Sequence, residues 1–379
     1  MSKAGYKVFD SDAHVSEPPE AIDAYVDSAY KSALDKLKLP GIKTYRPNQI
    51  GFQRRLGARR SEGDNAPKAA QPTKGRHRQA PLPNTNTDPH QRIQDMNLEG
   101  VDTCVMLPTG VGSFCSVDDL GLERAVIQAY HRYIGDFCKA YPGRLYAAAV
   151  VSARNIEWSV EELKRVGKEA WPAAVFPSVP PGMPLDDPEL DPLWKAAADN
   201  DLTIGLHTFT VLPPYAPGAR DGSYFDNYWL ARAAAHPWCG MRNMASLIGA
   251  GVMDRYPKLR IATLEAGHGW LPFWLARIDE HAKTIKSEIP ELKHLPSEYA
   301  TNGRYFQSIE VPEGEKLTNA VTDLLGDHVL MYASDYPHGE SHFPHTVDLV
   351  MDWKDTPEAR KRKLFWDNAV KCYPRCGLK

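Results

Sequence analysis

The sequence predicts a (β/α)8 barrel of the TIM type, with parallel strands in a closed ring and helices outside it, in a chain of 379 residues. Three observations support this fold class. Short apolar runs alternate with amphipathic stretches about eight times along the chain. The runs are nearly continuous, as in strands buried on both faces of a parallel sheet. Many end at proline or glycine, of which the chain has 31 and 27, so that each strand opens into a loop.

Eight apolar runs are the predicted strands. They cover residues 7–15, 101–108, 144–151, 173–178, 203–209, 260–268, 305–311 and 329–337. Between them, apolar residues recur every three to four positions, which predicts helices over residues 118–142, 155–169, 187–201, 270–285 and 313–326. A doubly wound open sheet is the main alternative fold. It is weakened because no G-x-G-x-x-G motif follows the first strand.

Two polar segments interrupt the strand and helix rhythm. Residues 41–90 are basic and rich in proline, glycine and asparagine, so they are predicted to form a long loop over the barrel mouth. This loop is inserted after the first β/α region of a single domain that spans residues 1–379 and ends in a C-terminal helical extension. Arg54 or Arg55 is a candidate to hold a substrate carboxylate. Residues 210–229 follow the fifth strand as a predicted lid.

The composition argues against several classes of protein. The formal net charge is −3, which gives no support to a nucleic-acid partner. No apolar run approaches the roughly 20 residues needed to cross a bilayer. The six cysteines form no C-x-x-C pair, and the first ten residues contain no apolar signal region. We therefore expect a cytoplasmic protein with reduced thiols and no membrane partner.

Residues of the types that commonly bind metals lie at or just after the ends of four predicted strands. They are Asp12, His14 and Glu17 in the first strand and its loop, His207 in the fifth strand, Glu265 and His268 in the sixth, and Asp335 and His338 in the eighth. Active sites of such barrels lie at the carboxyl ends of the strands, and residues two apart on a strand share a face. Two imidazoles and two carboxylates, from Asp12, His14, His207 and Asp335, can therefore converge on one ion. This donor set suits Zn²⁺, Fe²⁺ or Mn²⁺ better than Ca²⁺ or Mg²⁺.

The remaining polar candidates have simpler interpretations. Glu17 and His338 could instead supply hydrogen bonds in the loops after the first and eighth strands. Asp10 is expected to orient a neighbouring side chain or a backbone group. His236 is expected at the surface.

Four segments resemble the amidohydrolase superfamily, and specifically the branch that includes aminocarboxymuconate semialdehyde decarboxylase and the resorcylate and carboxyvanillate decarboxylases. The segments, in that family's order, are DPHQRIQDMNLEGVDTCVMLPT, YPKLRIATLEAGHGWLPFWLARIDEH, YASDYPHGES and FWDNAVKCYP. The resemblance implies that Asp12, His14, His207 and Asp335 hold a divalent metal, and that His268 is an acid or base beside it. Asp12 replaces the first histidine of the family's H-x-H pair, and the added charge favours Mn²⁺ or Fe²⁺ over Zn²⁺. No lysine ends the fourth strand, so a carboxylated-lysine bridge is not expected.

The predicted metal leaves three functions open. The first is a hydrolase or a non-oxidative decarboxylase that acts on a small carboxylated molecule, with His268 and Asp335 as catalytic residues. The second is an iron or mixed-metal oxygenase, in which Glu17, His338 and His268 hold a second ion. The third is a non-enzymatic subunit of a complex with a related chain. Aromatic residues in segments 270–281 and 363–374 favour a homodimer or a hetero-oligomer with a related chain.

Overall fold

Eight parallel strands pair in chain order to form one sheet. The computed structural model describes residues 5–36, 79–111, 119–180, 183–207, 228–289, 292–339 and 341–379. The strands are β1 (Phe9–Val15), β2 (Thr103–Pro108), β3 (Leu145–Ser152), β4 (Pro172–Ser178), β5 (Thr203–His207), β6 (Ile261–Leu264), β7 (Tyr305–Ser308) and β8 (Leu330–Met331). Every strand residue is buried, which explains why the runs are apolar throughout rather than alternating.

Backbone hydrogen bonds between β1 and the segment that begins with β8 bring the two ends of the sheet together. Ser11 N donates to Tyr332 O at 3.0 Å, and Asp335 N donates to Asp12 O at 3.0 Å. The sheet is therefore curled into a barrel, and the predicted (β/α)8 fold is confirmed.

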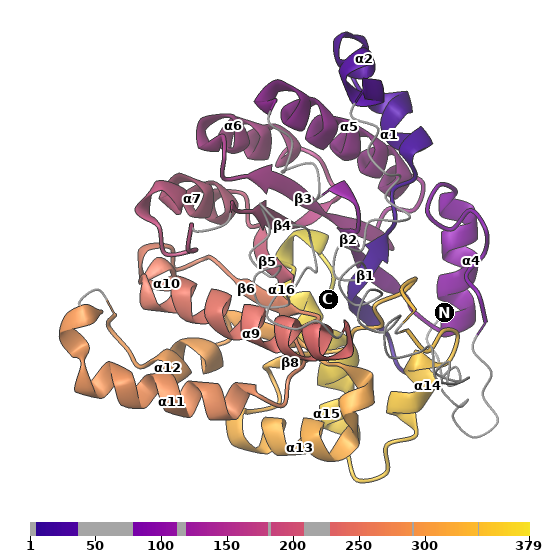
Figure 1. The fold of residues 1–379 in the computed structure, drawn as a ribbon. Coiled ribbons are helices and arrows are strands. Elements are labelled where there is room, and N and C mark those ends of the chain that lie inside the picture. The colour runs from indigo at the N-terminus through magenta and orange to yellow at the C-terminus, as the bar shows by residue number, and fades with distance from the viewer. Residues whose placement is uncertain are drawn as a thin grey trace, which may run out of the picture.

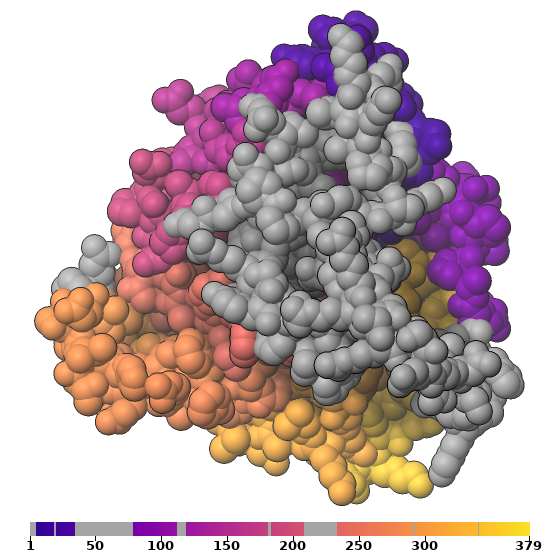
Figure 2. Space-filling view, in the orientation of Figure 1, coloured from indigo at the N-terminus to yellow at the C-terminus, as the bar shows by residue number. Residues whose placement is uncertain are grey.

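Helices surround the strands (Figure 1). They are α1 (Pro19–Tyr25), α2 (Ser28–Lys36), α4 (Pro89–Glu99), α5 (Leu120–Lys139), α6 (Ile156–Val166), α7 (Asp191–Asp199), α9 (Tyr228–Gly249), α10 (Val252–Arg255), α11 (Leu271–Thr284), α12 (Pro296–Thr301), α13 (Gly314–Leu325), α14 (Thr346–Met351), α15 (Glu358–Arg362) and α16 (Asn368–Cys372). In the view of Figure 1, α4, α5, α6, α7, α11 and α13 follow one another counterclockwise, whereas α16 lies near the centre of the ring. Figure 2 shows the same order around the rim, from indigo α1 and α2 at the top to the yellow C-terminal segment at the bottom. The predicted C-terminal helical extension corresponds to α15, α16 and the π-helical turn Lys363–Asp367 between them.

The polar insertion can be compared with the structure only at its end. Arg54, Arg55 and all but the last two residues of the predicted lid lie outside the described residues. Residues 79–88 form turns and irregular backbone. The loop ends earlier than residue 90, because Asp88 caps α4 by accepting a hydrogen bond from His90 N at 2.8 Å.

Several strands are shorter than predicted, and two of them stop before a functional candidate. β6 ends at Leu264 and β8 ends at Met331, so Glu265, His268 and Asp335 lie beyond the strands. Glu265 and Asp335 have φ angles of 49° and 57°, which cannot continue a strand. The prediction that His268 lies on strand six is therefore wrong, because the chain turns at Glu265.

No helix in the described ranges has both the length and the apolar character of a membrane span.

Candidate metal centre

Five side chains, three from β1 and β5 and two from the segments after β6 and β8, meet at the carboxyl ends of the barrel strands. His14 Nε2 lies 3.1 Å from His207 Nε2 and 3.3 Å from Asp335 Oδ1. Asp12 Oδ1 lies 3.6 Å from the Nε2 atoms of both histidines. Glu265 Oε2 lies 3.2 Å from His207 Nε2. The structure thus brings together the four predicted ligands and adds Glu265.

The short distances between these atoms are those of donors that share a metal ion, although the donors divide into two overlapping sets: Asp12, His14 and His207, and His14, Glu265, Asp335 and His338. Donor atoms bound at about 2.1 Å to one ion lie about 3.0 Å apart in octahedral geometry and about 3.4 Å apart in tetrahedral geometry. The five distances of 3.1 to 3.6 Å fall close to this range. Asp12 Oδ1 is buried and has no hydrogen-bond partner within the described part of the chain. A cation would supply the partner that this oxygen lacks.

Burial sets the protonation of this cluster in the absence of an ion. It raises the pKa of Asp12 well above its usual range, and the nearby Asp335 charge adds to the effect. It lowers the pKa of His14 well below its usual range, and His338 adds to that effect. His14 is therefore a neutral imidazole, the form that binds metals.

His338 lies at the edge of the cluster. Its ring stacks on that of His14 with centroids 4.0 Å apart, and its Nδ1 lies 2.8 Å from Asp335 Oδ1. The Thr109 hydroxyl lies 3.0 Å from His338 Nε2 and 3.4 Å from His14 Nδ1. The His338 side chain is 24% exposed, whereas that of His14 is 0% exposed, so His338 is the more accessible of the two.

Glu265 was not chosen as a ligand from the sequence, although it ends an apolar run as the other ligands do. The family resemblance assigned the sixth-strand position to His268 instead. The left-handed backbone of Glu265 and Asp335 is unusual for residues with a Cβ and costs about 1–3 kcal/mol each. Such strain gathers at functional sites, and it turns both carboxylates away from the paths of their strands.

His236 also lies by the cluster, and its predicted position at the surface is wrong. Its ring is half-buried, with Nδ1 3.0 Å from Glu265 O and 3.5 Å from Glu265 Oε1. Nothing in the sequence indicates that His236 lies near the cluster, because this residue belongs to α9 and is far along the chain from any strand end.

His268 is not brought to the other predicted ligands. Its ring is fully buried, with Nδ1 2.9 Å from Glu313 Oε2 and Nε2 2.9 Å from the Thr318 hydroxyl. Both ring nitrogens thus have partners from the segment that follows β7. The His268 side chain therefore connects α13 to the loop after β6, which is a structural role.

Glu17 is buried beside the loop after β2 and is not part of the cluster of donor atoms. Its Oε2 accepts a hydrogen bond from Gly110 N at 2.8 Å. Burial raises the pKa of Glu17 to about 7. Its contacts match the interpretation as a hydrogen-bonding group of the first loop.

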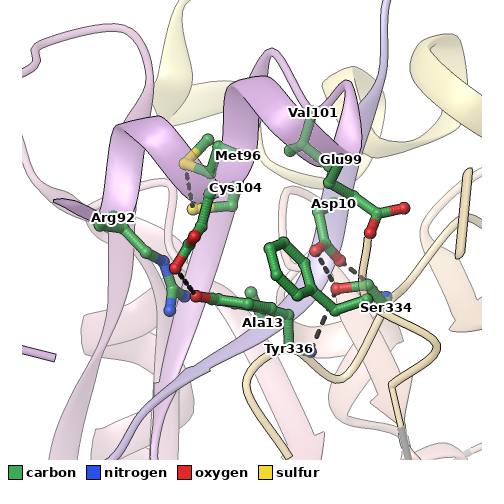
Figure 3. A pocket seen from close by; sticks show the side chains of 11 residues that line it. Asp10, Ala13, Arg92, Met96, Glu99, Val101, Cys104, Ser334 and Tyr336 are labelled. Atoms are coloured by element: carbon green, nitrogen blue, oxygen red, sulfur yellow. Dashed lines mark hydrogen bonds between the residues drawn. The ribbon is translucent and has the colours of Figure 1, made fainter. Parts of the chain in front are cut away.

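Arg92 of α4 and Tyr336 hold the backbone of His14 from both sides. Arg92 Nη2 donates to His14 O at 2.7 Å, and His14 N donates to Tyr336 O at 2.6 Å. The Arg92 guanidinium carbon lies 4.6 Å from the centre of the Tyr336 ring, and the Tyr336 hydroxyl donates to Asp95 (Figure 3). Arg92 is 1% exposed, so this contact is made away from bulk water, where it is strong.

Asp10 holds the segment that leads to Asp335. Its Oδ1 accepts from Ser334 N at 3.0 Å, and its Oδ2 accepts from the Ser334 hydroxyl (Figure 3). The orienting role expected for Asp10 agrees with these contacts. Burial raises the pKa of Asp10 to about 6, so the carboxylate is ionised at neutral pH.

Replacing Arg92 with methionine is expected to weaken Mn²⁺ binding about 10- to 100-fold, because His14 loses a partner that fixes its position. Isothermal titration of the ion-free protein with Mn²⁺ measures this change. Arg375→Met is the matched control, since Arg375 also donates to backbone carbonyls, including Pro172 O at the amino end of β4, away from the cluster. Equal losses of affinity in the two variants would contradict the role given to Arg92.

The chain is similar in sequence to known decarboxylases. The chain is 26% identical over 288 residues to a 2-amino-3-carboxymuconate-6-semialdehyde decarboxylase of Dictyostelium discoideum, covering 75% of this chain and 76% of that protein. It is 23% identical over 296 residues to a gamma-resorcylate decarboxylase of a Polaromonas species, covering 74% and 85%.

Solved structures share the fold. The 5-carboxyvanillate decarboxylase of Novosphingobium aromaticivorans, complexed with manganese and 4-hydroxy-3-methoxy-5-nitrobenzoic acid, has a TM-score of 0.70 at 22% identity, over 99% of this chain and 98% of that one. An amidohydrolase of Mycobacterium avium subsp. paratuberculosis has a TM-score of 0.71 at 20% identity, over 98% and 100%.

The sequence profile of one family, described as amidohydrolase, matches residues 10–375, which is nearly the whole chain. The predicted resemblance is confirmed: the chain belongs to the amidohydrolase family.

Proposed function

We propose that this chain is a metal-dependent, non-oxidative decarboxylase of a small aromatic carboxylate. The observation that carries the proposal is the convergence of Asp12, His14, His207, Glu265 and Asp335, with five donor-atom distances of 3.1 to 3.6 Å, in the range of donors that share a divalent ion. Support for the reaction comes from relatives named as decarboxylases of carboxymuconate semialdehyde, resorcylate and carboxyvanillate. None of the relatives described above is named as an oxygenase, so that alternative has no support.

The five side chains would hold the ion, and three of the five donors are carboxylate oxygens, which favours Mn²⁺ or Fe²⁺ over Zn²⁺. A manganese-containing neighbour supports Mn²⁺ as the ion to test first. When bound, a divalent ion supplies positive charge that can hold the oxygens of an anionic substrate. The left-handed backbone at Glu265 and Asp335 aims their carboxylates into the same space.

The proton that replaces CO₂ on carbon needs an acid. Of the two predicted acids, His268 has Glu313 and Thr318 on its ring nitrogens and lies apart from the cluster. Asp335 lies within it, and its Oδ1 faces both His14 and His338. We therefore assign the proton transfer to Asp335, at Oδ2.

The test is an assay under nitrogen with protein that has been stripped by a chelator and reloaded with Mn²⁺. Substrates are 2,6-dihydroxybenzoate, 5-carboxyvanillate and their methyl esters. We expect CO₂ and the matching phenol from at least one acid, and loss of this activity in His207→Ala but not in His281→Ala, which changes an exposed histidine of α11. Hydrolysis of the esters without CO₂ release would favour a hydrolase, and turnover that requires O₂ would favour an oxygenase.

A further inference from the structure

We propose that His236 is a positioning residue of the metal centre: from helix α9 it holds the backbone of Glu265, so that the Glu265 carboxylate faces the cluster. This inference rests on the proposed metal site and adds to it a residue that acts through one of the ligands. The hydrogen bond from His236 Nδ1 to Glu265 O, at 3.0 Å, carries it. A carbonyl oxygen can only accept, so Nδ1 holds the proton and donates it.

The backbone of Glu265 is held by side chains on both of its polar groups. Glu265 N donates to Ser308 Oγ at 3.1 Å, and Glu265 O accepts from His236. Between these two bonds the backbone has a φ of 49°, in the left-handed region. A residue with a Cβ keeps this conformation only where its surroundings hold it there. Loss of either bond therefore lets the turn relax and moves the carboxylate.

The two carboxylate oxygens of Glu265 lie between the cluster and the His236 ring. Oε2 lies 3.2 Å from His207 Nε2, on the side of the cluster. Oε1 lies 3.5 Å from His236 Nδ1. The second distance is too long for a strong hydrogen bond, so His236 acts mainly through the carbonyl and only weakly through Oε1.

Close packing of α9 on the loop after β6 brings His236 to this position. Gly240 lies one turn after His236, on the same face of the helix. A Cβ on Gly240 would lie only 2.8 Å from the Cβ of Ala266, so a residue larger than glycine would push the helix away. Trp274 Nε1 of α11 donates to Met241 O at 2.9 Å and fixes the next residue of α9.

The competing interpretation is that His236 only packs α9 against the barrel. Its loss would then lower the stability of the fold, and any effect on the ion would not depend on the Glu265 carboxylate. A positioning residue instead acts on the ion only as long as Glu265 is a ligand. A double-mutant cycle separates the two, because it measures whether the effects of two substitutions are coupled.

The experiment measures Mn²⁺ binding to chelator-treated protein by isothermal titration. His236→Phe keeps a ring of similar size but removes the N–H, and we expect it to weaken binding about 10- to 100-fold. His236→Asn keeps an N–H at the place of Nδ1 and should lose no more than about threefold. His328→Phe is the matched control and should leave the affinity unchanged. His328 also lies 2.7 Å from a backbone carbonyl, Thr301 O, but just before the amino end of β8, away from the cluster.

The cycle repeats His236→Phe in a Glu265→Ala protein, where we expect no further loss because the positioned ligand is gone. Equal losses in the two backgrounds, or no rescue by asparagine, overturn the proposal. Where Glu265→Ala binds no measurable Mn²⁺, the rescue by asparagine decides alone. Thermal unfolding with a chelator shows whether each variant is folded. Where His236→Phe is not folded, Ser308→Ala removes the other backbone bond and should give the same loss.

Failure of this inference and failure of the proposed function are distinguishable. Unchanged Mn²⁺ affinity in His236→Phe, with CO₂ release by the unaltered protein, overturns the role of His236 alone. Mn²⁺ binding that depends on His236, with no CO₂ release from any substrate, overturns the proposed function alone. An unaltered protein that binds no Mn²⁺ overturns both.

Discussion

Replacing Asp335 with asparagine is expected to lower kcat/KM for CO₂ release by about 10³-fold or more, because one change removes a metal ligand and the assigned acid. Asparagine has nearly the same shape and tolerates the left-handed backbone at this position, where φ is 57°. The loss is therefore chemical and does not come from unfolding. Steady-state kinetics with Mn²⁺-loaded protein measures it.

The same substitution is expected to stabilise the ion-free protein at neutral pH. The Asp335 charge helps to raise the pKa of Asp12, so removing it relieves repulsion between two buried carboxylates. Asp367→Asn is the control, because Asp367 is exposed in the π-helical turn and should change neither property. An Asp335→Asn protein that keeps full activity, or that loses activity only through a lower melting temperature, would contradict the assigned role.

Mn²⁺ is expected to stabilise the protein against heat, and more strongly at pH 8 than at pH 5. A divalent ion binds the ionised form of Asp12, whose folded-state pKa is raised, so binding releases a proton and the affinity rises about tenfold per pH unit until Asp12 is ionised. At about 1,000 times its dissociation constant, the ion adds about 4 kcal/mol to the free energy of unfolding. Melting curves with Mn²⁺ and with a chelator at the two pH values measure the effect.

The ion-free protein should show the opposite trend with pH. A carboxyl group whose pKa is raised by folding favours the folded state when protonated, so its contribution is lost as pH rises from about 3.9 through the raised value. Asp10, with a pKa raised to about 6, acts in this way between about pH 4 and pH 6, and Asp12 continues the trend upward. Equal stabilisation by Mn²⁺ at pH 5 and pH 8 would show that no raised carboxyl group takes part in binding.

Much of the architecture could be predicted from the sequence because the strands are buried on both faces and therefore read as continuous apolar runs. Asp12 and His14 were found because the period of a regular strand places them on one face. His268 was predicted beside the metal in place of Glu265 because the family resemblance assigned it the sixth-strand position, and the strand was expected to continue past Leu264, where it ends. A left-handed residue other than glycine leaves no mark in the sequence, so the turn at Glu265 could not be anticipated.

Contacts between residues far apart in the chain also could not be predicted from the sequence. Arg92 lies on the helix after the long insertion, and its bond to His14 O joins positions 78 apart in the chain. His236 reaches Glu265 from α9. Such partners depend on the angle and depth at which a helix packs on the barrel, which side-chain periodicity along one element does not determine.

The hydrogen bond from Asp335 N to Asp12 O joins the last barrel segment to the first, so the order of synthesis matters for this protein. During translation, Asp12 and His14 leave the ribosome more than 300 residues before Asp335, and for that period they have no complete cage in which to bind an ion. If these side chains bind an ion, they would complete its site only after the final strand has docked. A nascent chain released before that point would be an apo fragment, exposing acidic and imidazole groups that the finished barrel conceals.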